Sequence, residues 1–193
     1  MIKPADFFKE RLYLAVMNRA FTQFTRWSGT AKRLSALAIF VLAGTTLHAA
    51  NADVYWDNGA GNNDWGTANN WNPNGLPATG LGTAGDKIHI NLSGANRAVY
   101  SAATGTNTYQ FIRISDSAAS GELQVTGGLL VSDSTATTYI SSGGQTGTLN
   151  QSGGTVGFGG YLEVGLGANS IGNIDLSGGT LKARGIRRGG KWG

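Results

Sequence analysis

The apolar and polar positions in the second half of the chain are organised by a block that occurs three times. Each copy begins with glycine, places an apolar residue between polar ones, and closes with a Gly-Gly pair. The copies occupy residues 121–128, 147–154 and 172–179, so the steps from one copy to the next are nearly equal. Alternation with a period of two is typical of β-strands, and a nearly constant spacing in this range is typical of solenoid proteins. The pattern therefore predicts a repeating unit built from short strands.

Two further columns of apolar residues run in step with this block. The first recurs at almost the same spacing and consists of Ile90, Ile114, Ile140 and Val164. The second follows the Gly-Gly pairs and consists of Leu130, Val156 and Leu181. Val99 lies one such step before Leu123 and is expected to be its counterpart one unit earlier. Each unit thus has about three strands separated by Gly/Ser/Thr/Asn turns, and the pattern starts near Ile88.

Strands that meet their equivalents one unit later satisfy the requirement for a β-helix, in which each coil pairs with the coils on either side. We therefore expect an all-β protein, a right-handed parallel β-helix of about four coils with about 25 residues each, over residues 88–183. The residues expected to fill the interior are Leu123, Leu149 and Ile174. Those expected to face water are Gln124, Asn150 and Asp175. Gln151 conflicts with the pattern, because it occupies an inward position.

Residues 53–87 precede these coils and differ from them in composition. They are rich in Asn and Gly and contain Trp56, Trp65 and Trp71. The first coil of a solenoid exposes an unpaired edge and an open core, and the two prolines of this segment cannot extend a ladder of backbone hydrogen bonds. We interpret the segment as an N-terminal cap whose tryptophans close the core. The alternative is that these three rings stack on sugars.

The cap and the repeats together resemble a known bacterial family. The cap sequence WDNGAGNNDWGTANNWNPNGLP leads to a Gly-Asp pair before the first strand, and the units GTLNQSGGTV and GNIDLSGGTL follow with YLEVGLG between them. Residues 54–183 are in these respects similar to secreted β-helical surface proteins with autotransporter-associated β-strand repeats, or to the similar sorting-signal β-helix proteins. The resemblance implies a surface passenger. Since no translocator barrel or sorting helix follows the coils, we expect a truncated passenger, and we interpret residues 184–193 as a basic, irregular tail.

Residues 1–52 are interpreted as an N-terminal extension and a helical secretory signal peptide. Lys32 and Arg33 precede an apolar run over residues 34–47, which leads to a small-x-small sequence at residues 50–52. The run is shorter than the roughly 20 apolar residues of a spanning helix, so membrane contact is expected only before cleavage. An uncleaved signal anchor is the alternative.

The distribution of charge and the lack of cysteine argue against several classes of function. The chain has a net charge of +4, but residues 53–181 carry three basic and nine acidic side chains, a net of −6. Five basic residues lie within residues 182–193. Because the excess of basic residues belongs to the leader and the tail, we expect no nucleic-acid partner. The absence of cysteine excludes disulfides and thiolate metal sites.

The expected mature chain offers little catalytic chemistry. Its one histidine is His89, which lies between two isoleucines and should therefore point away from the core as a solvent-facing residue. A polysaccharide-cleaving β-helix would need clustered carboxylates, whereas the acidic residues are spread along the coils. The Asn/Asp-rich turns at residues 57–59 and 62–64 offer oxygen ligands for calcium, but without calcium-loop spacing they are better explained as turns. We expect no enzyme activity, no cofactor and no metal site.

These features predict a non-catalytic, secreted or cell-surface bacterial protein, associated with the outer membrane, with a structural or adhesin-like role. The alternative is a carbohydrate-binding or polysaccharide-degrading β-helix protein. An acidic cluster around a groove, or two surface tryptophans at sugar spacing, would favour the alternative, whereas polar ladders alone would favour the structural role. Self-association through the open end of the β-helix is expected, and a surface polysaccharide is a further candidate partner.

Overall fold

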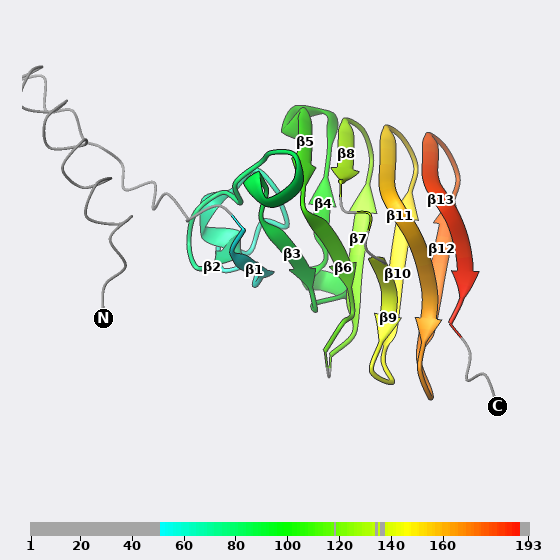
Figure 1. The fold of residues 1–193 in the computed structure, drawn as a ribbon. Helices are drawn as coiled ribbons and strands as arrows, with labels where there is room; N and C mark the ends of the chain where they lie inside the picture. The colour runs from blue at the N-terminus through cyan, green and yellow to red at the C-terminus, as the bar shows by residue number, and fades with distance from the viewer. Residues whose placement is uncertain (1–50, 118, 134, 136–137, 190–193) are drawn as a thin grey trace, which may run out of the picture. The chain divides into compact units, whose positions relative to one another are not determined.

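The computed structural model describes residues 51–117, 119–133, 135 and 138–189 (Figure 1). The chain divides into two compact units, Met1–Leu42 and Ala43–Gly193, and all described residues belong to the second. The predicted leader therefore lies almost wholly outside the described residues, as do residues 190–193. In the described part of the chain, no helix is long and apolar enough to cross a membrane.

The described part is an all-β solenoid of about four turns (Figure 1). Its strands are β1 (Asp53–Trp56), β2 (Trp71–Asn72), β3 (Lys87–Ile90), β4 (Ala98–Tyr100), β5 (Thr106–Tyr109), β6 (Phe111–Ile114), β7 (Gly121–Val125), β8 (Leu129–Ser132), β9 (Thr138–Ser142), β10 (Thr146–Gln151), β11 (Thr155–Leu166), β12 (Ile171–Leu176) and β13 (Thr180–Arg188). Short 3₁₀ helices in the connections are η2 (Ala68–Asn70), η3 (Gly82–Ala84), η4 (Gly94–Asn96) and η5 (Ala102–Thr104).

Parallel pairing between successive coils builds three faces of the solenoid. The first face has the order β1-β3-β6-β9-β11-β13, and the second has the order β4-β7-β10-β12. In the third face, β5 pairs with β8, and β8 pairs with the first half of β11. The first half of β11 pairs in turn with the start of β13. Each coil thus passes through each face once, as the three columns of the sequence predict.

The block that repeats in the sequence occupies one stacked position in the structure. Leu123 on β7 pairs with Leu149 on β10, which pairs in turn with Ile174 on β12. Leu123 and Leu149 are fully buried, and Ile174 of the last coil is partly buried. Aliphatic side chains of one rung therefore lie on those of the next, which excludes water from the interior. The predicted stacking of these residues is confirmed.

The two other predicted columns are confirmed as well. One aligns Ile90, Ile114, Ile140 and Val164 across the first face. The other aligns Leu130, Val156 and Leu181 across the third face. The counterpart of Leu123 in the preceding coil is Ala98, not Val99, so that prediction is wrong by one position. β4 turns Ala98 and Tyr100 to the interior, where both side chains are fully buried.

The ladder begins one coil earlier than the predicted start near Ile88. β1 pairs in parallel with β3, which aligns Val54 with Ile88 and Trp56 with Ile90. Val54 and Trp56 are both buried. β2 then pairs with β1 in the antiparallel sense, with Trp71 opposite Trp56. The tryptophan-rich segment is therefore joined to the stack through its own backbone hydrogen bonds.

The ladder also continues farther into the tail than the sequence predicts. β13 extends to Arg188, pairing Ile186 with Leu162 and Arg188 with Val164, so the prediction of an irregular segment from residue 184 is wrong for residues 184–188. Backbone amides and carbonyls pair with β11 whatever side chains they carry. Arg188 consequently takes a position that aliphatic residues occupy in the preceding coils.

The glycine that opens each repeat is required by the close approach of neighbouring backbone. A Cβ on Gly121 would collide with the carbonyl oxygen of Ile90, and one on Gly147 would lie 2.6 Å from the amide nitrogen of Ser141. Gly172 is similarly crowded by Gly165. The second glycine of each closing pair has a positive φ, a conformation in which other residues are strained. These two requirements explain why the block recurs with its glycines in place.

Gln151 lies inside the solenoid, 1% exposed, in register with aliphatic residues of the neighbouring coils. Its Nε2 donates hydrogen bonds to the carbonyl oxygens of Gly153 and Gly154 at 3.3 Å and of Thr180 at 3.0 Å. The amide therefore joins a corner of its own coil to the next coil. The Oε1 of Gln151 is buried without a hydrogen-bond partner among the described residues, so the inward amide is satisfied on its donor side only.

Truncating a central leucine should cost far more stability than truncating its equivalent in the last coil. Leu149→Ala would open a cavity between two packed rungs, so we expect the free energy of unfolding to fall by about 2–5 kcal/mol. Ile174→Ala removes a partly exposed side chain and should cost markedly less. Denaturant unfolding of the full-length chain measures both, and equal losses would contradict the stacked arrangement.

A charge at the Gln151 position should destabilise the solenoid. Gln151→Glu replaces the amide donor by a buried carboxylate facing three carbonyl oxygens, so we expect a loss of about 3 kcal/mol or more in the free energy of unfolding at pH 7. Gln124→Glu is the matched control, since this outward side chain accepts a hydrogen bond from Arg97 at 2.8 Å. The control should stay within about 0.5 kcal/mol of the parent. Similar losses for both variants would argue against an inward Gln151.

Candidate functional sites

The three tryptophans considered as sugar contacts lie in the core. Trp56, Trp65 and Trp71 are 3%, 1% and 0% exposed. Their rings pack edge to face, with centroids 5.1 Å apart for Trp56–Trp71 and 4.7 Å apart for Trp65–Trp71. Each indole N–H donates to a protein oxygen, that of Trp65 to the Tyr109 hydroxyl at 2.9 Å. Rings buried in this way offer no face to a sugar, so the structure favours their interpretation as core residues.

His89 points out of the core, as alternation predicts, but the prediction that it faces solvent is wrong. It is 6% exposed, because the Tyr55 ring stacks on it at a centroid distance of 4.7 Å and the Phe111 ring packs edge-on at 5.4 Å. Tyr55 belongs to the coil before His89, and Phe111 belongs to the coil after it. The alternation of apolar and polar residues along β3 gives no information about Tyr55 and Phe111, because these rings belong to other coils.

Two carboxylates hold the imidazole of His89 in place. Its Nδ1 lies 2.6 Å from Oδ2 of Asp116, and its Nε2 lies 3.1 Å from Oδ1 of Asp53. Nζ of Lys87 lies 3.7 Å from Oδ2 of Asp53, and Nη1 of Arg113 lies 3.9 Å from Oδ2 of Asp116. We call these five residues the histidine clamp. It joins the coils of β1, β3 and β6 on the outside of the first face.

The charges of the clamp favour a protonated histidine. Burial alone would lower the pKa of His89, but hydrogen bonds and charges from Asp116 and Asp53 outweigh it and raise the pKa above its usual 6.5. Burial alone would raise the pKa of Asp116, but His89, Asn91 and Arg113 outweigh it and lower the pKa below its usual 3.8. Both ring nitrogens of His89 are paired with carboxylates, and both neighbouring coils contribute rings that cover the imidazole, so the clamp links three coils of the solenoid.

The outward column of the repeat faces away from the core, as predicted. Gln124, Asn150 and Asp175 are aligned on β7, β10 and β12. A hollow of about 270 Å³ lies along them and is bordered also by Ser152 and Ser177. Its polar groups are amides and hydroxyls with one carboxylate, so it is a polar ladder and not an acidic cluster. It can donate and accept hydrogen bonds along the stack.

The Asn- and Asp-rich turns of the N-terminal part form hydrogen bonds within themselves. The Asp57 carboxylate accepts from the backbone N–H of Gly59 at 2.9 Å. The Asp64 carboxylate accepts from the N–H of Gly66 at 3.3 Å and from the hydroxyl of Thr67 at 3.0 Å. These contacts are the ones by which Asp stabilises turns. Among the described residues, no group of three or more His, Cys, Asp or Glu side chains is placed to hold a metal ion.

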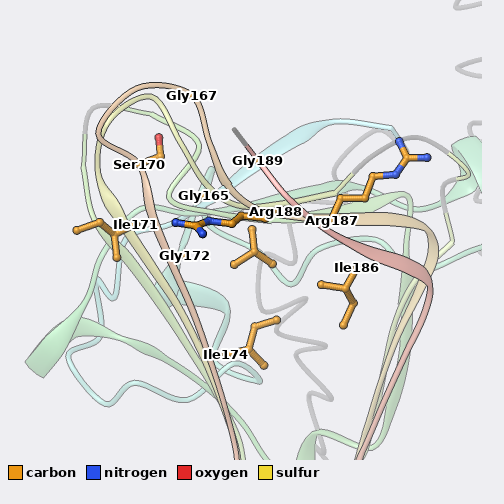
Figure 2. A pocket seen from close by; sticks show the side chains of 11 residues that line it. Gly165, Gly167, Ser170, Ile171, Gly172, Ile174, Ile186, Arg187, Arg188 and Gly189 are labelled. Atoms are coloured by element: carbon orange, nitrogen blue, oxygen red, sulfur yellow. The ribbon is translucent and has the colours of Figure 1, made fainter. Parts of the chain in front are cut away.

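Within the described residues, the interior of the last coil is covered by a neighbouring coil on one side. In the described part of the chain, β12 and β13 pair only with the preceding coil. Ile171, Leu176 and Ile186 are 56%, 52% and 57% exposed. The counterparts of Leu176 and Ile186 in the preceding coil, Gln151 and Leu162, are buried. A hollow of about 670 Å³ lies at this end, lined by Ile171, Ile174 and Ile186 among others (Figure 2).

Two neighbouring arginines of β13 extend in opposite directions at this open end. Figure 2 shows Arg188 extending across the hollow and Arg187 extending away from it. The Arg187 guanidinium packs on the Tyr161 ring, 3.4 Å from its centroid. Sequence reasoning missed the inward place of Arg188, because the tail was expected to be irregular. The available signal was its spacing from Val164, which equals the steps from Ile90 to Ile114 and from Ile140 to Val164.

Comparison of the chain with models of protein families, with curated proteins and with solved structures finds no match in any of the three. The described residues define a parallel β-solenoid. The function is therefore argued from the geometry of the sites described above.

The histidine clamp should make stability depend on pH in a defined direction. The raised pKa of His89 contributes stability below pH 6.5 that is lost as the pH rises through the folded-state value. The lowered pKa of Asp116 contributes stability above pH 3.8 that is lost as the pH falls through its folded-state value. Both contributions to the free energy of unfolding are present between pH 3.8 and pH 6.5. Lys87, Arg113 and Asp53 are the other charged groups that face this site.

We therefore expect His89→Gln to lower the free energy of unfolding by about 1–3 kcal/mol at pH 6, because it removes a charge-assisted hydrogen bond from two carboxylates. The difference between parent and variant should shrink between pH 6 and pH 9. Denaturant unfolding of parent and variant at a series of pH values measures this difference in the free energy of unfolding. A difference that grows with pH would contradict a protonated clamp.

Proposed function

We propose that this chain is a non-catalytic structural passenger, secreted or displayed at a bacterial cell surface, with an adhesin-like role. The observation that carries the proposal is the continuous parallel ladder, in which the coils repeat a mainly apolar interior and present polar columns outward. Such a stack forms an extended surface by repetition, which is the way solenoid proteins present large contact areas.

The distribution of charge supports a non-catalytic role. The two carboxylates that approach His89 share the same imidazole, which neutralises part of their charge. Paired acid and base chemistry requires a titrating group that can reach a substrate, whereas His89 is covered by rings from the coils on either side. The outer column at Gln124 and Asn150 carries amides, which do not serve as proton donors or acceptors in catalysis.

The proposal includes three features that we predict from the sequence, namely export by the leader, an N-terminal cap and right-handed winding of the coils. The cap is supported by β2, which pairs antiparallel with β1 and so ends the parallel ladder, and by the buried tryptophans beside it. Self-association is also part of the proposal. It is supported by the exposed Ile171 and Ile186 and by the unpaired strand edges of the last coil.

Carbohydrate binding is the second candidate function, and the hollow along Gln124, Asn150 and Asp175 favours it. Polar groups repeated at roughly 4.8 Å can form hydrogen bonds with successive hydroxyl groups of an extended polysaccharide. Sugar sites usually add an aromatic platform, but Trp56 is buried and Arg187 covers a face of Tyr161. The structural role is therefore the better supported of the two.

The structural proposal predicts that the full-length chain neither cleaves nor tightly binds soluble polysaccharides. We expect no release of reducing ends from a panel of neutral and acidic polysaccharides, and no saturable heat in isothermal titration calorimetry. We expect the chain to be retained on bacterial cells or coated surfaces, because the extended polar surface is its contact area.

Saturable polysaccharide binding would instead favour the second candidate, provided that Asn150→Ala combined with Asp175→Ala weakens it at least about tenfold. Thr148→Ala is the control, since Thr148 lies on the same strand outside the hollow. Release of reducing ends by the parent chain would contradict the non-catalytic role.

A further inference from the structure

Within the described residues, the strand β5 pairs with another strand on one side only. On that side lies β8, and the carbonyl oxygen of Gly105 accepts a hydrogen bond from the backbone N–H of Leu129 at 2.9 Å. Because successive residues of a strand direct their backbone groups to opposite sides, the N–H and C=O groups of Thr106 and Thr108 point away from β8. The hydrogen bond from the Gly80 N–H to the Thr108 carbonyl oxygen, at 2.9 Å, agrees with this orientation.

Three of these four backbone groups have no hydrogen-bond partner among the described residues. They are the N–H and C=O of Thr106 and the N–H of Thr108. Between β2 and β3 the first coil forms η3 and irregular segments, and no strand described there pairs with β5. A short stretch of the third face therefore has an unpaired strand edge, and such an edge binds extended chains.

A hollow of about 420 Å³ adjoins this edge. It is lined by Asn107 and Tyr109 of β5 and, among others, by Trp65, Leu76 and Pro77 of the first coil. Leu76 is 53% exposed, so a group that fills the hollow would bury apolar surface. None of the described residues that line the hollow is charged. A carboxylate or an ammonium group would lose its hydration there without gaining a counter-charge.

Two polar side chains of the hollow retain hydrogen-bonding capacity. The Tyr109 hydroxyl is almost fully buried and accepts from the Trp65 indole N–H at 2.9 Å, but no described residue accepts its own hydrogen. The Asn107 Nδ2 donates to the Tyr100 hydroxyl at 2.9 Å and to the Thr104 carbonyl oxygen at 3.1 Å. No donor among the described residues reaches the Asn107 Oδ1. A hydroxyl group on a bound ring matches this lining, because it accepts one hydrogen bond and donates another.

We propose that the free edge of β5 and the adjoining hollow bind an extended peptide, which adds to β5 as a strand and places an uncharged aromatic side chain, best a tyrosine, in the hollow. Backbone hydrogen bonds supply affinity in this mode of recognition, and the side-chain pocket supplies selectivity. Since the Gly80 N–H already occupies the Thr108 carbonyl oxygen, the free edge is short and suits one peptide better than the sheet edge of a second copy. This inference goes beyond the proposed surface role and does not depend on it.

Binding of a defined peptide tests the site. The probe is the fluorescently labelled peptide KTVTYTVTK, whose terminal lysines keep it soluble, titrated with the full-length chain and followed by fluorescence polarisation. We expect saturable binding. Replacing the central tyrosine by glycine or by lysine should weaken binding at least about tenfold, because glycine leaves the hollow empty and lysine buries an unpaired charge. Replacing it by phenylalanine should weaken binding about three- to tenfold through loss of the hydroxyl group.

Hydrogen exchange followed by NMR tests the addition of a strand. Saturating peptide should slow exchange of the Thr106 N–H, the Thr108 N–H or both at least about tenfold, because an unpaired amide becomes hydrogen-bonded. The Leu129 N–H is the internal reference, since it is already bonded to β5. Its exchange should change by less than about twofold.

Filling the hollow tests its role in binding. Thr79 is exposed and lines the hollow, so Thr79→Trp should occupy part of it. This variant should bind the tyrosine peptide at least about tenfold more weakly. Thr83→Trp makes the same change at an exposed position of η3 outside the hollow and should alter the affinity by less than about threefold. Circular dichroism and thermal unfolding verify that both variants fold, and the peptide series tests the hollow on the unchanged chain.

The outcomes are distinct. Absence of saturable binding overturns the proposal. Equal affinity of the tyrosine and glycine peptides overturns the role of the hollow, and unchanged exchange at both Thr106 and Thr108 overturns the addition of a strand. If 4-methylphenol alone binds as tightly as the peptide, the hollow is a small-molecule site and the peptide proposal is wrong.

A second copy of the chain is the remaining occupant to test. If copies associate in sedimentation velocity, and Thr79→Trp but not Thr83→Trp prevents this, the occupant is a second copy and the peptide proposal is again wrong. Retention on bacterial surfaces is measured separately, so failure of the peptide site leaves the proposed function standing.

Discussion

Backbone hydrogen bonding between successive coils is the constraint on which this structure depends. A strand of one coil finds its partners in the coils before and after it, so the register at one position fixes the register of the whole column. The glycine that opens each repeat follows from this requirement, because Gly147 lies where neighbouring backbone leaves no room for a Cβ. The aliphatic columns follow from it too. Once Leu123 and Leu149 share a register, one dry interior can be continued indefinitely.

The periodic part of the fold could be predicted because side-chain identity and backbone register repeat together. The alignment of Leu123, Leu149 and Ile174 is contained in their spacing. The first coil was missed as part of the ladder because Trp56 takes the place of an aliphatic residue, so the column changes residue type at its start. The last strand was missed in part for the same reason, since Arg188 replaces an aliphatic residue at its end.

The surroundings of His89 could not be predicted from one strand. Asp116 and Asp53 lie 27 and 36 residues away in the sequence and reach the imidazole only because the coils stack. Alternation correctly places His89 outside the apolar interior, but it says nothing about what covers the outer face. In a solenoid, that face is built from residues one repeat apart, so its chemistry depends on columns and not on local pattern.

The histidine clamp and Arg188 differ in whether neighbouring coils supply groups of opposite charge. Around His89, coils on both sides supply carboxylates, so the imidazole is buried among partners from its own chain. At Arg188, the described chain has a neighbouring coil on one side only, and the counter-charge is missing on the other. An open apolar end without a charge would accept any exposed strand edge, as unprotected edges do. Arg188 places a positive charge in that interior column, so the side of the last described coil that has no neighbouring coil is not purely apolar.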